Sequence, residues 1–227
     1  MPSVLITGSG RGIGVELARQ YAAADWTVYA TLRNTDRAAA LLAIQGDVKV
    51  LELDVADPES ITTLAGRMAG TPIDLLINNA GIYGPRGLGL GGLSYGDWEQ
   101  VLAVNTLGPV RMVEAFLEHL RAGEQKKIAA ITSKMGSIAE NTSGANYIYR
   151  SSKAALNATM KSVALDLKGE GFSVAIIHPG WVRTDMGGPN ALIEPRQSVQ
   201  GMRRVIEAAT PATTGRFYNY DGTEIPW

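Results

Sequence analysis

Short runs of consecutive apolar residues alternate along the chain with longer segments whose apolar residues recur every three or four positions. The runs VLIT at 4–7 and LLIN at 75–78 are apolar on successive positions, as expected of strands that helices cover on both faces. The predicted strands are Val4–Thr7, Thr27–Thr31, Lys49–Leu53, Leu75–Asn78, Ile128–Thr132, Val174–His178 and Arg216–Tyr218. The predicted helices are Ile13–Ala24, Asp36–Ala43, Ser60–Met68, Asp97–Leu120, Tyr147–Lys168 and Ser198–Ala208.

This alternation is typical of βαβ units. It predicts an α/β fold, in which residues 1–227 form one Rossmann-like domain: a doubly wound parallel sheet of about seven strands with helices on both faces. Two segments rich in glycine or proline interrupt the pattern, Gly84–Ser94 and Pro179–Arg196. Each follows the carboxyl end of a strand, where ligands bind on such sheets, so we expect both to be substrate loops. Trp181 and Met186 in the second loop either line a pocket or pack the loop down.

Composition narrows the function. With 45% hydrophobic residues, 19% charged residues and a net charge of −1, the 227-residue chain is expected to be globular and to bind neither nucleic acid nor a membrane. The absence of cysteine and the presence of only two histidines exclude disulfides and Cys- or His-rich metal sites, so we predict no metal. No export signal or membrane-spanning run is recognisable, so a cytoplasmic location is expected.

The first predicted strand runs into the glycine-rich segment TGSGRGIG, which contains Gly8, Gly12 and Gly14, and a helix follows at Ile13. Glycines allow a tight turn and let the backbone approach a phosphate, while a helix N-terminus attracts its negative charge. Because the pattern stands between a strand and a helix, a dinucleotide site is favoured over a plain turn.

Tyr149 and Lys153 lie four residues apart on a predicted helix and therefore share a face. An ammonium near a phenol favours the phenolate and lowers a pKa that is otherwise about 10, which would make Tyr149 a tunable acid. Tyr147 lacks such a partner, since Ser151 lies four residues beyond it. An isolated Tyr–Lys pair is usually an ordinary surface contact, so this reading depends on the accompanying motifs.

Taken with those motifs, the sequence resembles the short-chain dehydrogenase/reductase family. TGxxxGIG at 7–14 is similar to the nucleotide motif of the family, and NNAG at 78–81 and YxxxK at 149–153 are similar to two others. The remaining matches are Asn105, Ser133 in ITSKMG, and Pro179-Gly180 followed by Thr184. The C-terminal part resembles the branch that includes C-factor and Sniffer-type carbonyl reductases.

The resemblance implies a catalytic set of Asn105, Ser133, Tyr149 and Lys153. Tyr149 would supply a proton, Lys153 would lower the pKa of Tyr149 and bind the nicotinamide ribose, and Asn105 would hold a water that links Lys153 to solvent. Ser133 would donate a hydrogen bond to the substrate oxygen, and Ser137 is its rival. The expected cofactor-binding residues are Gly8, Arg11, Gly12, Ile13, Gly14, Arg33, Asp54, Val55, Asn79, Ala80, Gly81, Tyr149, Lys153, Pro179, Gly180, Val182 and Thr184.

The residues after the second strand favour NADP(H) over NAD(H). That position reads Thr31-Leu32-Arg33-Asn34, with no acid to bind a ribose hydroxyl, and Arg11 in the glycine segment adds a second base. Together the two arginines could accept the additional phosphate of NADP.

The expected function is therefore NADP(H)-dependent reduction of a ketone or aldehyde, or oxidation of the alcohol, on a small-molecule substrate. An NAD(P)-binding regulatory protein with little turnover is the alternative, and a sugar-nucleotide epimerase is disfavoured by the glycine spacing. By resemblance, the two long helices at 97–120 and 147–168 would permit a homodimer or homotetramer.

Overall fold

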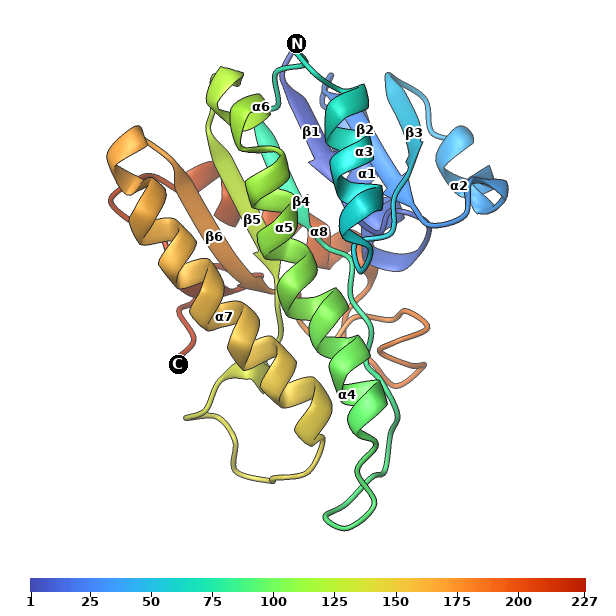
Figure 1. Ribbon diagram of the computed structural model, residues 1–227, viewed down its shortest axis with the longest axis vertical. Coiled ribbons are helices and arrows are strands. Elements are labelled where there is room, and N and C mark those ends of the chain that lie inside the picture. The colour runs from blue at the N-terminus through green and yellow to red at the C-terminus, as the bar shows by residue number, and fades with distance from the viewer.

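The computed structural model describes all residues 1–227 and contains one seven-stranded parallel sheet (Figure 1). The strands lie in the order β3-β2-β1-β4-β5-β6-β7, and each pairs in parallel with its neighbours. Their bounds are β1 Ser3–Ile6, β2 Thr27–Leu32, β3 Val48–Glu52, β4 Leu75–Asn78, β5 Lys127–Ile131, β6 Ser173–His178 and β7 Arg216–Asn219. The predicted α/β fold and all seven predicted strands are confirmed.

Helices cover both faces of the sheet because successive strand residues point to opposite sides. On β1, Leu5 joins one apolar cluster, whereas Val4 and Ile6 join the other. The first cluster includes residues of α3 (Pro58–Arg67), α5 (Gly108–Ala115) and α7 (Tyr147–Leu167). The second includes residues of α1 (Gly12–Ala22), α2 (Ala39–Leu42) and α8 (Pro195–Ala208). The central strands β1 and β4 are thus buried along their whole length, as their apolar sequences predict, whereas the edge strands β3 and β7 are partly exposed.

The prediction of a single helix over Asp97–Leu120 is wrong. The segment forms α4 (Tyr95–Leu102), one wide π turn at Ala103–Leu107, α5, and then α6 (Leu117–Ala122) after a break at Phe116. Pro109 has no backbone N–H to donate to the preceding turn, and a proline inside a helical pattern disrupts regular pairing. Asn105 lies inside the π turn, a distortion that is frequent at functional sites.

The helix predicted over Asp36–Ala43 is also only partly formed. A 3₁₀ turn at Thr35–Arg37 and the one-turn α2 take its place. The other helices agree with their predicted windows to within a few residues, and no helix is long and apolar enough to cross a membrane.

The two predicted loops lie beyond the carboxyl ends of β4 and β6, although Pro195 and Arg196 already belong to α8. They meet where the Arg86 guanidinium donates to the carbonyl oxygen of Met186 at 2.6 Å. The strand order reverses between β1 and β4, and ligands of doubly wound sheets bind in the crevice at such a point. The fold therefore places both loops at the expected ligand edge.

Candidate active site

The glycine segment forms a close turn between β1 and α1. Gly8 and Gly12 have φ of 68° and 54°, a left-handed conformation that glycine adopts without strain. The helix can start this close to the turn only with glycine at position 14, because a Cβ there would lie 2.2 Å from the carbonyl oxygen of Gly8. The amides of Gly12 and Ile13 donate to no backbone carbonyl, as is usual at the start of a helix. This turn therefore fits a phosphate group, as the sequence predicts.

Asn79 and Ala80, after β4, are tied to the glycine segment by Thr7. The Thr7 hydroxyl accepts hydrogen bonds from the amides of Asn79 and Ala80, both at 3.0 Å. In return, the Asn79 side-chain amide donates to the carbonyl oxygens of Thr7 at 2.9 Å and Gly8 at 3.0 Å. Sequence reasoning missed Thr7 as a positioning residue, although its place directly before the first glycine was a signal.

The loop after β6 reaches the same turn from the other side. A Cβ at Gly12 would lie 3.1 Å from the Thr184 side chain, so the two segments are in near contact. Gly180 has φ of 84°, and Val182 is buried and pairs with Ile193. The structure thus brings this loop to the glycine segment, as expected for a shared ligand. Pro179 is held by a hydrogen bond from Ser198 to its carbonyl oxygen at 2.5 Å.

Arg11 is not free in this arrangement. Its guanidinium forms an ion pair with Asp185 at 2.9 Å, and both side chains remain about three-quarters exposed, at 76% and 75%. An ion pair so exposed contributes little free energy and exchanges readily for another anion. Asp185 was not among the residues singled out from the sequence.

The outer end of the crevice carries Arg33, Asp54 and Val55. Arg33 follows β2, is exposed, and forms no ion pair. The Asp54 carboxylate accepts a hydrogen bond from the Ala56 amide at 2.9 Å, so it shapes its own turn, while Val55 is buried. Arg33 is therefore the side chain most available to an added anion here.

Tyr149 and Lys153 lie on α7 and are both buried. Burial raises the pKa of Tyr149 to about 12, although hydrogen bonding with Ser133 opposes the rise. Burial lowers the pKa of Lys153 to about 8. The Lys153 ammonium lies 5.9 Å from the centre of the Tyr149 ring and donates to the carbonyl oxygen of Ile131 at 3.0 Å. The sequence predicts that Lys153 lowers the pKa of Tyr149. In this arrangement no such lowering is found, because desolvation of the buried phenol dominates.

Asn105 joins this pair to the NNAG segment. Its side chain accepts from the Ile82 amide at 2.9 Å and donates to the Ile82 carbonyl oxygen at 2.8 Å and to Ser152 at 3.0 Å. A Cβ at Gly81 would lie 3.3 Å from the Asn105 Oδ1 atom and 3.5 Å from the Lys153 Nζ atom. The Asn105 side chain therefore fixes the backbone beside Lys153, and its role toward a water stays a prediction.

The two candidate serines differ in their contacts. Ser133 follows β5, and its hydroxyl accepts from the Met135 amide at 3.1 Å. Ser137 donates to the Pro226 carbonyl oxygen at 2.5 Å and accepts from the Glu140 amide at 3.1 Å. Gly136 lets the turn approach α7, since a Cβ there would lie 2.8 Å from the carbonyl carbon of Lys153. The geometry therefore favours Ser133 as the partner of Tyr149, while Ser137 holds the C-terminal segment.

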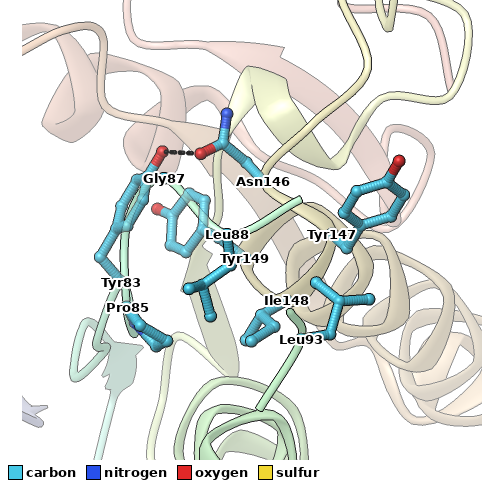
Figure 2. A pocket seen from close by; sticks show the side chains of 9 residues that line it. All are labelled: Tyr83, Pro85, Gly87, Leu88, Leu93, Asn146, Tyr147, Ile148 and Tyr149. Carbon is cyan, nitrogen blue, oxygen red and sulfur yellow. Dashed lines mark hydrogen bonds between the residues drawn. The ribbon is translucent and has the colours of Figure 1, made fainter. Parts of the chain in front are cut away.

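Two further residues beside Tyr149 were missed from the sequence, Tyr83 and Asn146. Figure 2 shows the Tyr83 ring against that of Tyr149, with its hydroxyl bonded to Asn146, while Tyr147 points away. The position of Tyr83 two residues after NNAG was a weak signal. Nothing in the sequence around Asn146 indicated its role.

These features define a doubly wound α/β protein with a dinucleotide-type glycine turn beside a buried Tyr–Lys pair. The short chain dehydrogenase model matches residues 2–192. The chain is similar to the C-signal of Myxococcus xanthus, with 49% identity over 156 residues, covering 69% of this chain and 93% of that protein. This chain therefore belongs to the short-chain dehydrogenase family and is an oxidoreductase.

Two solved structures resemble the whole chain. The NADPH-bound carbonyl reductase from chicken fatty liver is 33% identical, with a TM-score of 0.91, covering 100% of this chain and 99% of that one. The carbonyl reductase Sniffer of D. melanogaster is 31% identical, with a TM-score of 0.91 and complete coverage of both chains. The predicted resemblance to the family and to its C-factor and Sniffer-type branch is confirmed.

Proposed function

We propose that the protein reduces a ketone or aldehyde, or oxidises the corresponding alcohol, with NADP(H) as cofactor and residues 1–227 as one NAD(P)-binding unit. The observation that supports this most is the convergence of Ser133, Tyr149 and Lys153 in one buried cluster. The cluster lies beside the NNAG segment, which is itself bonded to the glycine turn. A protein that only binds a dinucleotide would not need this set.

NADP(H) is the cofactor that these residues fit. The glycine turn leaves no room for a Cβ at Gly14 and presents free amides at the start of α1. Arg33 is exposed beyond β2, and Arg11 is an exposed residue of the glycine segment, so both side chains can bind the additional phosphate. When bound, NADPH supplies the hydride, and the protein supplies position and proton transfer.

Tyr149 is the proposed proton donor. With its pKa raised to about 12 by burial, its phenol keeps its proton at neutral pH and is ready to give it to a substrate oxygen. A charged Lys153 beside the phenol would favour the phenolate left behind, and the Ser133 hydroxyl would donate to the developing negative charge on the oxygen. Asn105 holds the Ile82 backbone, which directly follows the NNAG segment, in place.

The proposal is tested with a panel of aldehydes and ketones, by following the absorbance of NADPH. We expect turnover of at least one compound by the parent protein. Tyr149→Phe should keep cofactor affinity but lose about 10²–10⁴-fold in turnover, the usual contribution of a positioned acid. Cofactor binding without turnover of any compound would contradict the proposed function, and near-normal turnover by the variant would contradict the assigned donor.

A further inference from the structure

The space beside Tyr149 is almost filled in this structure. Its cavity measures about 10 Å³, which is room for roughly one water molecule. The lining residues, shown in Figure 2, are Tyr83, Pro85, Gly87, Leu88, Leu93, Asn146, Tyr147, Ile148 and Tyr149. A carbonyl compound that reaches the Tyr149 hydroxyl from this side must therefore displace one of these groups.

Tyr83 is the group that covers Tyr149 most directly. The two rings stack with their centres 4.3 Å apart and their planes 18° from parallel. The Arg86 guanidinium lies over the Tyr83 ring, 4.4 Å from its centre. The Tyr83 hydroxyl donates to the Asn146 side-chain oxygen at 3.1 Å. Three different contacts thus hold one aromatic ring over the reactive phenol.

The backbone at Asn146 is shaped for this contact. Gly144, Ala145 and Asn146 have φ of 65°, 54° and 50°, three successive residues in the left-handed region. For Ala145 this conformation is unfavourable, and such strain persists where the surrounding structure maintains it. The turn leads directly into α7, so it places Asn146 three residues before Tyr149.

The chain that follows Tyr83 is a glycine-rich loop. Tyr83 precedes Gly84, which has φ of 76°, and the loop beyond it contains four more glycines before Leu93. The side-chain hydrogen bond from this loop to the loop after β6 comes from Arg86, which reaches Met186. Gly84 itself is closely packed, because a Cβ there would lie 2.8 Å from the Val101 side chain, but Gly87, Gly89 and Gly91 have no atom within 4 Å of their Cβ positions. The Tyr83 side chain can therefore leave its stack by rotating, with Arg86 following on the loop beyond Gly84.

We propose that Tyr83 is a specificity-determining gate: its ring, bonded to Asn146, narrows the path to the Tyr149 hydroxyl so that carbonyl compounds unbranched beside the carbonyl are preferred. This inference rests on the proposed carbonyl reduction. A substrate with a tertiary carbon beside the carbonyl needs the ring to leave both its stack and its hydrogen bond. A slender substrate needs a smaller displacement.

The test compares kcat/KM for a straight-chain aldehyde and for an aldehyde with a tertiary carbon beside the carbonyl. In Tyr83→Ala the ratio of the branched to the straight substrate should rise about ten-fold or more, as a pocket enlarged by a side chain permits. Tyr83→Phe and Asn146→Gly each remove the hydrogen bond and keep the ring, and should raise the ratio by about three- to ten-fold. Asn146→Gly retains the left-handed backbone.

The matched control is Tyr95→Ala, because Tyr95 is an exposed tyrosine on α4, with 71% of its surface accessible. The ratio of kcat/KM for the branched to the straight-chain aldehyde in Tyr95→Ala should equal that of the parent protein. The double variant Tyr83→Phe/Asn146→Gly should change the ratio no more than either single variant, since both remove the same bond. An equal change for both aldehydes in Tyr83→Ala and Tyr83→Phe would overturn the gate.

A second measurement does not depend on turnover, so failure of the gate is distinguishable from failure of the proposed function. In protein labelled with ¹³C at the tyrosine ring, the Tyr149 resonance is assigned by its loss in Tyr149→Phe. Removing the Tyr83 ring should expose Tyr149 and bring its titration down from a pKa of about 12 toward the ordinary value near 10. A titration unchanged from that of the parent would show that Tyr83 does not cover Tyr149.

Discussion

The two sides of Tyr149 are built in different ways. On the cofactor side, backbone meets backbone: a Cβ at Gly14 would lie 2.2 Å from the Gly8 carbonyl oxygen, and a Cβ at Gly8 would lie 2.8 Å from the Ala80 Cα atom. On the substrate side, single side-chain contacts join segments distant in sequence, such as Tyr83 to Asn146 and Arg86 to Met186. The first region has no spare space, and the second is held by bonds that can open.

This difference matches what each side must do. A cofactor of fixed shape is bound well by a rigid backbone surface, because little order is lost on binding. Substrates that enter and leave need a path that opens, and loops joined by a few side-chain hydrogen bonds can provide one. Variants on the two sides should therefore lose function for different reasons. On the cofactor side an added side chain collides with the backbone, whereas on the substrate side a hydrogen bond between loops is lost.

After Tyr149→Phe, the largest effect on the substrate side is expected at Ser133, whose proposed role is chemical, whereas that of Ser137 is structural. Ser133→Ala should lower turnover by about 10²-fold or more, since it removes a donor to the developing oxyanion. Ser137→Ala should cost much less turnover but lower the free energy of unfolding by about 1 kcal/mol, because the hydroxyl that bonds the Pro226 carbonyl is lost. Turnover and urea unfolding measure the two quantities, and the reverse ranking would identify Ser137 as the active serine.

The next effect tests the rigid side. Gly14→Ala should destabilise the protein by about 1–3 kcal/mol and weaken NADPH binding by a similar amount, because the added methyl group collides with the Gly8 carbonyl. Gly66→Ala is the matched control: Gly66 lies in α3 with no atom within 4 Å of its Cβ position, and alanine favours helix. Urea unfolding and NADPH titration give both values. Equal behaviour of the two variants would mean that the glycine turn yields more easily than its geometry implies.

The same difference explains what could be predicted from the sequence. The sheet, the glycine turn and the NNAG segment depend on local patterns, such as apolar strands and glycines before a helix, so their residues carried the signal. The π turn at Ala103–Leu107 was missed because apolar spacing continues through it, and only Gly108 and Pro109, directly after it, marked the irregularity. Tyr83 and Asn146 were missed because their contact joins residues 63 positions apart, and no local spacing encodes it.

At the outer end of the cofactor side, Arg33 should determine the preference for NADPH. A hydrogen bond to a charged group contributes about 1.5–3 kcal/mol, so Arg33→Ala should weaken NADPH binding roughly ten- to a hundred-fold and hardly change NADH binding. Added salt should reduce the preference for NADPH over NADH, because Arg33 is exposed and its attraction to the phosphate is screened. Titrations of parent and variant with both cofactors, at low and moderate salt, measure this. An equal loss for both cofactors would exclude Arg33 as the phosphate ligand.

The smallest effect concerns Asp185, where the two sides meet through its ion pair with Arg11. If Arg11 also serves the additional phosphate, Asp185 competes for it, and Asp185→Asn should tighten NADPH binding. Exposed ion pairs are worth about 0.2–1 kcal/mol, so the gain should be at most about five-fold and should vanish at high salt. Glu194→Gln is the matched control, because Glu194 carries the same charge close by but pairs with Arg183 instead. Titrations with NADPH and NADH decide the point: tightening of both cofactors alike, or the same gain in the control, would mean that Asp185 acts through net charge rather than by occupying Arg11.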